Sequence, residues 1–459
     1  MKSGALTASL CEFVLGARDG DFPPEARERA RDALIDCMGC MLLGSRDTLA
    51  GMLLRVLPHF PPDGAAGRAR LIGTEWEAAL ADAALFNGTI AHAQDFDDTN
   101  HPGYAHPSAV LAPVLLALGP PAGRDGAALI TAYIVGLEVI GKLGRALNTP
   151  HYQRGWHPTV TFGTLAAVAV AGRLLGLSRE QLAMGVGVAG SAAGGLRASF
   201  GTMTKPLHAG YAARNGVLAA LLAREGFTAD ADVLAHPFGF AQVFNGGEGI
   251  DPAPLRSWGS PLEILSEFGL ALKPYPSCGA THPGIEAALL LHGELAGRTA
   301  DLRAVRVGVP ELALQPLIHE NPATPLQAKF SIQFCVAAAL AQGAVTLETF
   351  TPQGLASPAI RSLLPRVWRE VDPRVRDDPE FATIVTVETA DGSTRSREVP
   401  LALGKPSRWF TPERLRAKFF DCGRGVLPQE RLEAVYASLA ALDGQPSLEA
   451  VLRALMPDC

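Results

Sequence analysis

The feature that most constrains the fold is a series of apolar helical patterns that fills the first half of the chain. Between Pro23 and Leu43, apolar residues recur at three- and four-residue steps, which is the spacing of one helix face. Pro24 suits the first turn of this helix, and Glu25 and Glu28 lie near its positive end. The same periodicity predicts further helices at Glu75–Phe86, Ser108–Leu118, Gly126–Leu147, Val160–Leu175, Ser178–Ala193 and Ala209–Glu225. Strand signals are nearly absent before residue 260, so we expect Ala- and Gly-rich helices that pack closely together.

The pattern changes after Leu272, where strand signals join the helical ones and Asp391-Gly392 indicates a hairpin. The predicted elements are strands at Leu302–Pro310, Phe381–Val387 and Arg395–Pro400, helices at His282–Leu295 and Ala328–Ala341, and renewed helix from Thr411 to Leu455. A chain of 459 residues is too long for one ordinary core. We therefore expect a mainly α-helical protein with a large all-α domain at 1–269, a smaller α+β lid domain at 270–400, and C-terminal helices at 401–459 that return to the helical domain.

Charge and composition narrow the possible partners. The 40 basic and 46 acidic residues give a net charge of −6 without visible segregation, which argues against nucleic acid or an anionic membrane surface. The seven cysteines are odd in number and scattered, which suits a reducing compartment better than a disulfide framework. No run reaches the ~18 consecutive apolar residues of a membrane helix, since Arg173 interrupts even the segment that begins at Val160. We expect a soluble, cytoplasmic protein.

Residues 91–108 crowd polar side chains between two apolar helices. This first insertion carries His92, Asp95, Asp97, Asp98, Thr99, His101 and His106. Because uncompensated buried charge is costly, such a segment predicts either a metal site or a polar cleft for a charged ligand. A solvated loop whose aspartates cap a helix is nearly as consistent with these residues alone. Three further insertions favour the cleft.

The other polar insertions interrupt apolar helices in the same way. Residues 151–159 place His157 just before a helix, where the N-terminal dipole can help to hold an anion. Residues 197–210 contain Arg197, Thr204 and Lys205, and residues 273–282, which join the two predicted domains, contain Lys273, Tyr275, Cys278 and His282. Together the insertions offer His, Lys and Asp for proton transfer and Lys, Arg and Thr for carboxylate binding. This inventory suits chemistry at the carbon next to a carboxylate.

Cofactor motifs lack their required context. The stretch Gly185–Gly190 has the spacing of a dinucleotide fingerprint, but a capped helix precedes it where that motif needs a strand. The sequence contains no GxSxG elbow, Walker loop, HExxH or paired CxxC. A metal held by Asp95, Asp97, Asp98, His101 and His106 is an alternative. The missing motifs leave nucleophilic hydrolysis, nucleotide chemistry and zinc without support from the sequence.

The four insertions resemble the motifs of the MmgE/PrpD family. The matching stretches are AHAQDFDDT with HPS, then WHPT, then FGTMTKPLHAG with AARNGVLAALLA and GFT, then KPYPSC with a nearby TH, and also the segment around Ala328-Lys329-Phe330-Ser331. The resemblance implies a homodimer whose subunits have a helical domain and an α+β lid, with a cofactor-free active site between these domains. The family's site residues would fall on Asp95, Thr99, His106, His157, Lys205, Lys273 and His282.

These observations favour a cofactor-independent lyase or isomerase that removes a proton alpha to the carboxylate of a small di- or tricarboxylate. We expect His106 or His157 to act as the base, because histidine changes charge closest to neutral pH. Asp95 would orient a histidine, while Lys205 and Lys273 face the developing enolate. Dehydration of a 2-methylcitrate-like hydroxy acid ranks first, epimerisation of an iminodisuccinate-like compound second and decarboxylation of cis-aconitate third. A relative that binds polycarboxylates without turnover is a further alternative.

Overall fold

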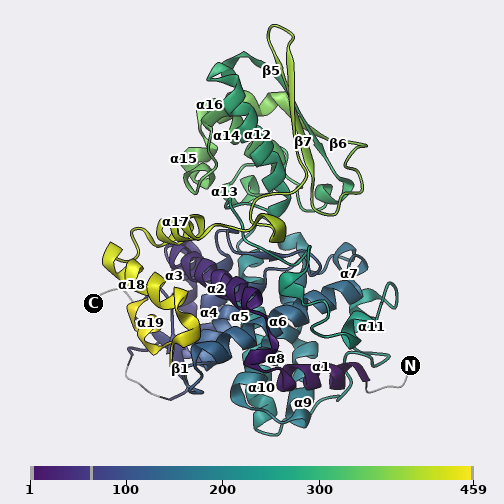
Figure 1. Cartoon of the computed structure of the whole chain (residues 1–459), viewed down its shortest axis with the longest axis vertical. Coiled ribbons are helices and arrows are strands. Elements are labelled where there is room, and N and C mark those ends of the chain that lie inside the picture. Colours follow the sequence, from purple (N-terminus) through teal and green to yellow (C-terminus); the bar gives the residue numbers. More distant parts are fainter. Residues whose placement is uncertain (1–4, 63–65, 456–459) are drawn as a thin grey trace. The chain divides into compact units, whose positions relative to one another are not determined.

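The computed structural model describes residues 5–62 and 66–455, which form two compact units (Figure 1). Unit 1 takes its described residues from Met1–Ser199, Met203–Leu272 and Phe410–Cys459, and unit 2 consists of Phe200–Thr202 and Lys273–Trp409. Helices dominate the described elements, which confirms the expectation of a mainly helical protein. The chain therefore completes most of unit 1, builds unit 2, and then returns to unit 1.

Unit 1 consists of helices with two small antiparallel sheets. Its helices are α1 (Ala5–Gly16), α2 (Pro24–Gly44), α3 (Thr48–Val56), α4 (Leu80–His92), α5 (Pro107–Leu118), α6 (Gly126–Leu147), α7 (Pro150–Gln153), α8 (Pro158–Leu175), α9 (Arg179–Ala192), α10 (Thr204–Arg224), α11 (Phe240–Asn245), α17 (Pro412–Gly423), α18 (Gln429–Ala440) and α19 (Glu449–Ala454). The sheets pair β1 (Arg68–Arg70) with β2 (Glu77–Ala79), and β3 (Thr99–Asn100) with β4 (Leu270–Ala271). Helix α8 packs against α5, α6, α9 and α10, so it forms the centre of this unit.

Glycines let two of these helices approach backbone to backbone. A methyl group added at Gly88 of α4 would lie 2.9 Å from the Cα atom of Gly210 of α10. One added at Gly210 would lie 2.3 Å from the carbonyl oxygen of Leu85. Real side chains do not tolerate such distances, so glycine is required at both positions. The glycines at 185 and 187 lie inside α9 against neighbouring residues, as expected for helix packing rather than for a dinucleotide turn.

Helices α6 and α8 are the two described helices whose length and hydropathy would suffice to cross a membrane. In each of them, 89% of the apolar window is buried inside the described structure. The guanidinium of Arg173, near the end of α8, donates to the carbonyl oxygen of Val14 at 2.8 Å. Apolar residues all round a helix are expected where protein covers every side of it.

Helices α4 and α10 differ most from the sequence prediction. Helix α4 ends at His92 rather than at Phe86. The helix predicted at Glu75–Phe86 begins only at Leu80, because Glu77–Ala79 pairs with Arg68–Arg70 as a strand. The helix predicted from Ala209 begins already at Thr204. Pro206 lies in its first turn, where a missing N–H costs no intrahelical hydrogen bond. This earlier start places residues 204–210, the second half of the third polar insertion, on a helix.

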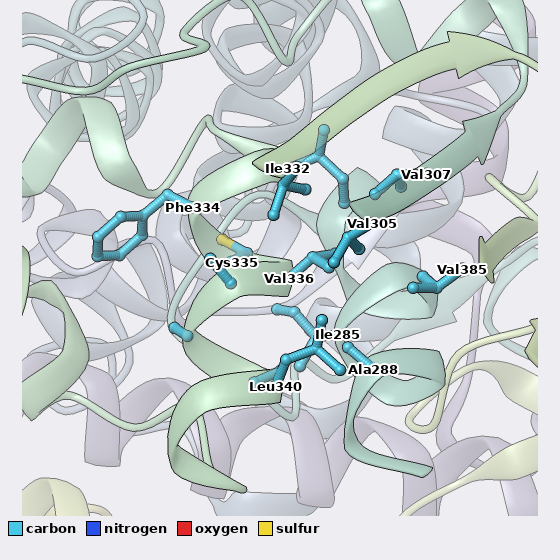
Figure 2. Close-up of a cluster of buried hydrophobic side chains, with 14 of the residues drawn as sticks. Ile285, Ala288, Val305, Val307, Ile332, Phe334, Cys335, Val336, Leu340 and Val385 are labelled. Atoms are coloured by element: carbon cyan, nitrogen blue, oxygen red, sulfur yellow. The ribbon is translucent and has the colours of Figure 1, made fainter. Parts of the chain in front are cut away.

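Unit 2 contains a four-stranded sheet with helices packed against it. Strands β5 (Leu302–Val309), β6 (Val367–Val371), β7 (Thr383–Thr389) and β8 (Thr394–Val399) lie in the order β6-β5-β7-β8, with β5 and β6 parallel and the other pairs antiparallel. The helices are α12 (His282–Leu295), α13 (Pro325–Ala328), α14 (Ile332–Gln342), α15 (Pro352–Leu355) and α16 (Pro358–Leu363). Figure 2 shows the core, where Val305 and Val385 from the sheet lie beside Ile285 of α12 and Val336 of α14. The sequence predicted β5, β7 and β8 but not the edge strand β6.

Candidate active site

Two His-Pro steps place histidines at the N-termini of helices in unit 1. His106 precedes Pro107, the first residue of α5, and His157 precedes Pro158, the first residue of α8. Proline at the first helical position needs no N–H partner, and it keeps the residue before it out of the helical conformation. The backbone N–H of His106 donates to the hydroxyl of Thr159 at 3.2 Å. Thr159 of the second polar insertion therefore holds the backbone of the first insertion at His106.

Hydrogen bonding fixes the neutral tautomer of His106. Its Nδ1 lies 2.9 Å from the carbonyl oxygen of Asp98 and 3.3 Å from Oδ2 of Asp97. Both partners are acceptors, so Nδ1 carries the proton and the neutral ring has its lone pair on Nε2. Nε2 lies 3.8 Å from Oδ1 of Asp95, and the His106 side chain is 12% exposed. In this neutral form, Nε2 of His106 can accept a proton.

Lys205, in the third polar insertion, bonds two residues of the first insertion. Its Nζ, in the first turn of α10, donates to Oδ1 of Asp95 at 2.6 Å and to Nε2 of His92 at 2.9 Å. His92, the last residue of α4, donates from Nδ1 to Oδ1 of Asp97 at 2.8 Å. All four side chains are buried. Asp95 has a φ of 52°, in the left-handed region that residues other than glycine rarely adopt and that is often found at functional sites.

Burial and hydrogen bonds set the charges of this cluster. Burial acts to raise the pKa of Asp97, but the charges and hydrogen bonds of His92 and His106 outweigh it and hold this pKa well below its usual range. Burial lowers the pKa of His92, although Asp97 acts in the opposite direction. Burial also lowers the pKa of His157 well below its usual value, and Lys205 is among the cationic neighbours that lower it further. At neutral pH, Asp97 is therefore ionised while His92 and His157 are neutral.

The cluster offers the donor atoms of a metal site but already contains a cation. One atom each from His92, Asp95, Asp97 and His106 lie within 4.8 Å of one another. Two of these residues, His92 and Asp95, bind the ammonium of Lys205. A divalent ion would have to displace that ammonium or approach against its charge. We conclude that the donor set fits a lysine-filled polar site better than a metal site.

Two further residues that the sequence offered as metal ligands make other contacts. The carboxylate of Asp98 accepts the N–H of Ser108 at 3.1 Å and is also bonded by the hydroxyls of Ser108 and Tyr133. Burial raises the pKa of Asp98 to about 7. The ring of His101 meets that of Tyr104 edge-on, with 5.3 Å between centroids. Asp98 thus supports His106 through its carbonyl oxygen, and His101 packs beside Tyr104.

The remaining predicted residues of unit 1 lie around the ends of its elements. Arg197 donates from Nη1 to the carbonyl oxygen of Tyr152 at 2.7 Å, and its guanidinium lies 3.7 Å from the centroid of the Tyr152 ring. These contacts hold Arg197 against α7. Thr204 begins α10 directly before Lys205 and is exposed. Thr99 stands in β3, where it pairs with Ala271.

In unit 2, the predicted residues lie in the segment that leads into α12, at positions 273–282. His282 is the first residue of this helix, and its Nε2 donates to the carbonyl oxygen of Ser277 at 3.1 Å. The ring of Tyr275 meets that of His282 edge-on, with 5.4 Å between centroids. Lys273 is buried and Cys278 is half-buried. Tyr275 and His282 therefore pack against each other within unit 2.

The structure adds His92, Asp97 and His208 to the predicted site residues. Nδ1 of His208 lies 2.9 Å from Nδ1 of His157. His208 follows Lys205 by one helical turn, so the two share a helix face. The sequence would have shown this if α10 had been expected to begin at Thr204. His92 stands in the first polar insertion, but its contact with Lys205, 113 residues later in the chain, had no local signal.

Comparison with known proteins shows the family of this chain. The sequence model described as "MmgE/PrpD N-terminal domain" matches residues 8–253, and the one described as "MmgE/PrpD C-terminal domain" matches residues 275–441. The cis-aconitate decarboxylase-like protein oryM of Aspergillus oryzae is 28% identical over 98% of this chain and 97% of its own length. Cis-aconitate decarboxylase of Mus musculus is 30% identical over 81% of this chain and 78% of its own length. 2-Methylcitrate dehydratase of Cupriavidus necator is 29% identical over 89% of this chain and 91% of its own length. The chain therefore belongs to the MmgE/PrpD family.

Proposed function

We propose that this protein is a lyase or isomerase that moves a proton alpha to a carboxylate of a small di- or tricarboxylate. One observation carries the proposal. A single cluster of unit 1 contains the neutral imidazole of His106, whose lone pair is on Nε2, and the buried ammonium of Lys205. A carbon acid next to a carboxylate is weak. Its deprotonation therefore needs a base at the proton and a cation where negative charge accumulates.

His106 is the proposed base. Once its Nε2 has taken a proton, the imidazolium lies 3.8 Å from Oδ1 of Asp95 and 3.3 Å from Oδ2 of Asp97. These carboxylates stabilise the cation and keep the ring oriented, as a carboxylate does in a catalytic triad. Lys205 is the proposed partner for a substrate carboxylate and for the enolate that forms from it.

Dehydration of a 2-methylcitrate-like hydroxy acid is our first proposal for the reaction. It requires a base for the alpha proton and a separate hydrogen-bond donor for the departing hydroxyl group. His106 and His157 supply two imidazoles from two different helix N-termini. A relative that aligns with most of this chain bears the name 2-methylcitrate dehydratase.

Decarboxylation of a cis-aconitate-like acid is the second proposal. It is supported by relatives named cis-aconitate decarboxylase that align with most of this chain. Loss of carbon dioxide leaves a carbanion that must be protonated, and His106 in its imidazolium form would supply that proton. Epimerisation of an iminodisuccinate-like compound would use the same base to remove a proton that is then returned to the opposite face.

Lys273 and His282 of unit 2 are proposed to serve the same reaction, on the strength of the motifs that they occupy. We also propose that turnover needs neither a metal nor an organic cofactor and that the protein is a homodimer. Exhaustive chelation should therefore leave activity unchanged, and sedimentation equilibrium should give twice the mass of the chain. Activity that is lost on chelation and restored by one specific metal would contradict the first of these expectations.

The deciding experiment incubates the protein with a panel of hydroxy, unsaturated and imino polycarboxylates in heavy water and follows product masses. Loss of water identifies dehydration, loss of carbon dioxide identifies decarboxylation, and deuterium uptake alone identifies epimerisation or proton exchange. His106→Gln should abolish the reaction while ligand binding persists. His101→Gln is the matched control, because its ring packs beside Tyr104. Polycarboxylate binding without turnover or exchange would indicate a binding protein, and a fully active His106→Gln variant would exclude His106 as the base.

A further inference from the structure

Two buried histidines of unit 1 face each other through the same ring nitrogen. Nδ1 of His157 lies 2.9 Å from Nδ1 of His208. His157 is the residue before α8, and its backbone N–H donates to the carbonyl oxygen of Gly195 at 3.0 Å. His208 lies in the second turn of α10. Both side chains therefore stand on elements that the helices of unit 1 hold in place.

A hydrogen bond between two Nδ1 atoms requires complementary tautomers. One ring must carry the proton that is shared, and the other must offer a lone pair. In the neutral pair, the accepting ring therefore has its own proton on Nε2, and the donating ring has a bare Nε2. Only two arrangements exist, and they present opposite groups at Nε2 of His157.

The surroundings of the pair keep both rings neutral. Burial is the main cause that lowers the pKa of His208 to about 4 and that of His157 well below its usual value. Repulsion from Lys205, and from His92 whenever that ring is protonated, lowers the pKa of both rings further, and His106 adds to this effect at His157. The centroids of the His92 and His157 rings are 6.4 Å apart. A neutral imidazole in such a place acts through its hydrogen bond rather than through its charge.

We propose that His208 is a positioning residue that donates its Nδ1–H to His157 and thereby holds His157 as the Nε2–H tautomer, a neutral hydrogen-bond donor toward an anionic ligand. This inference rests on the proposed function, because it takes the ligand of the cluster to be a polycarboxylate. A bare Nε2 on His157 would repel a carboxylate oxygen, whereas an N–H there stabilises it. The site then presents complementary groups, with an acceptor at Nε2 of His106 and a donor at Nε2 of His157.

The role predicts a specific response to substitution at His208. His208→Leu removes the donor and leaves His157 free to exchange tautomers. His208→Asn places an amide near the position of Nδ1 and can still donate to His157. We expect His208→Leu to lower kcat on the order of 10²-fold with a smaller change in KM, because the donor matters most where negative charge develops. His208→Asn should recover most of that loss.

Nitrogen NMR of the protein labelled with ¹⁵N-histidine tests the tautomers directly and without turnover. Signals are assigned by their loss in His157→Gln and His208→Asn, and citrate serves as the anionic probe. We expect His157 protonated on Nε2 and His208 on Nδ1, both with and without citrate, and a mixed tautomer at His157 in His208→Leu. The reverse arrangement, or an unchanged His157 spectrum in His208→Leu, would overturn the inference. Expected tautomers in a protein that turns over no polycarboxylate would leave the pairing intact and contradict the proposed function instead.

Discussion

At the scale of single residues, the ammonium of Lys205 lies between a histidine nitrogen and a carboxylate, all of them buried. Such a cation is oriented before a ligand arrives, so little reorganisation is needed when negative charge develops nearby. The same contacts explain why Asp95 can occupy an unfavourable backbone conformation. The carboxylate of Asp95 accepts a hydrogen bond from Lys205, which lies in α10.

Lys205→Met keeps the apolar stem of the side chain and removes the ammonium that bonds Asp95 and His92. Because a substrate carboxylate would lose its counter-charge, we expect kcat/KM to fall on the order of 10²-fold or more in steady-state kinetics. Lys405→Met is the matched control, since it removes an ammonium that pairs with Glu380 within unit 2. Unchanged kinetics in Lys205→Met would exclude Lys205 from the site.

His151 shows that a histidine in a polar motif can have a structural role. Its Nε2 bonds the hydroxyl of Thr161 at 2.8 Å, and its ring lies beside Phe162 and Phe244, with centroids 4.5 and 5.9 Å away. Burial lowers the pKa of His151 to about 4 from a usual value of 6.5. The folded protein therefore binds fewer protons at this site than the unfolded chain does between these two pH values.

This difference predicts how stability responds to acid. The contribution of neutral His151 to the free energy of unfolding is fully present above pH 6.5. It is lost as the pH falls toward 4, and the total loss is about 3 kcal/mol. Other buried groups titrate in the same range, so the test is the difference between wild type and His151→Gln in urea unfolding. We expect wild type to lose stability relative to the variant as the pH is lowered from 7 to 4. A difference that does not change with pH would show that His151 is not held neutral.

The residues that sequence analysis identified and missed differ in a physical way. Asp95, His106 and Lys205 stand in dense polar motifs between apolar helices, where their cost of burial indicates a function. His208 lies in the same insertion as Lys205, but its proposed role depends on His157, which lies 51 residues earlier in the chain. Pairings across such distances carry no local signal. The four predicted residues of unit 2 stay predictions, carried by their motifs.

At the scale of elements, the site depends on where helices begin and end. His92 ends α4, His106 and His157 precede α5 and α8, and Lys205 lies in the first turn of α10. Helix ends leave backbone groups without intrahelical partners, and they end apolar packing, so polar side chains are tolerated there. The sequence predicted most of these helices, but the start of α10 was masked by Pro206.

Gly210→Ala tests the contact that sets the distance between α4 and α10. The added methyl group would lie 2.3 Å from the carbonyl oxygen of Leu85, so the helices must separate at a cost of about 1–3 kcal/mol in unfolding free energy. We expect kcat to fall as well, because α10 carries Lys205. Gly51→Ala in α3 is the matched control, since its methyl group would meet only the Arg55 side chain at 3.6 Å. That variant should be more stable by about 0.5–1 kcal/mol and fully active, and an equally stable and active Gly210→Ala would contradict the argument.

At the scale of the whole molecule, the chain returns from unit 2 to unit 1, where α17 contacts the loop of residues 93–98 that carries Asp95 and Asp97. Lys418 of α17 bonds Oδ1 of Asp36 in α2 at 2.7 Å and the carbonyl oxygen of Phe96 at 2.7 Å. Its ammonium also lies 3.9 Å from the centroid of the Phe96 ring. Phe96 is the residue between Asp95 and Asp97. Helices α2 and α17 can be followed side by side in unit 1 (Figure 1).

Lys418→Met should destabilise the protein by about 3–5 kcal/mol, because it leaves the carboxylate of Asp36 buried without its cation. Asp36→Leu combined with Lys418→Met removes both charges and should recover most of the stability. The kcat/KM of this double variant should nevertheless stay below that of wild type, because the carbonyl oxygen of Phe96 no longer accepts the hydrogen bond from Lys418. Urea unfolding and steady-state kinetics measure the two effects. Wild-type kinetics in the double variant would show that α17 supports the fold alone.

The sequence predicted the helical character of the first half and three of the four strands in the sheet of unit 2. It did not predict β6, a short edge strand whose Val-Trp-Arg-Glu-Val segment pairs with β5 in parallel. The pairs β1–β2 and β3–β4 were also missed, because strands of two or three residues are too short to show alternation. Helix periodicity is a local property, whereas strand pairing depends on a partner elsewhere in the chain.

The contact between Gly88 and Gly210 has a consequence for transplanting this site. It fixes the spacing of α4 and α10 by backbone atoms, which have no rotamers with which to adjust. His92 and Lys205 meet at 2.9 Å on that spacing. A graft of the polar side chains onto another helix pair, with ordinary alanine or leucine at the crossing point, would hold the donor and acceptor too far apart to bond. Two residues without side chains therefore belong to the minimal set that a designer would have to copy.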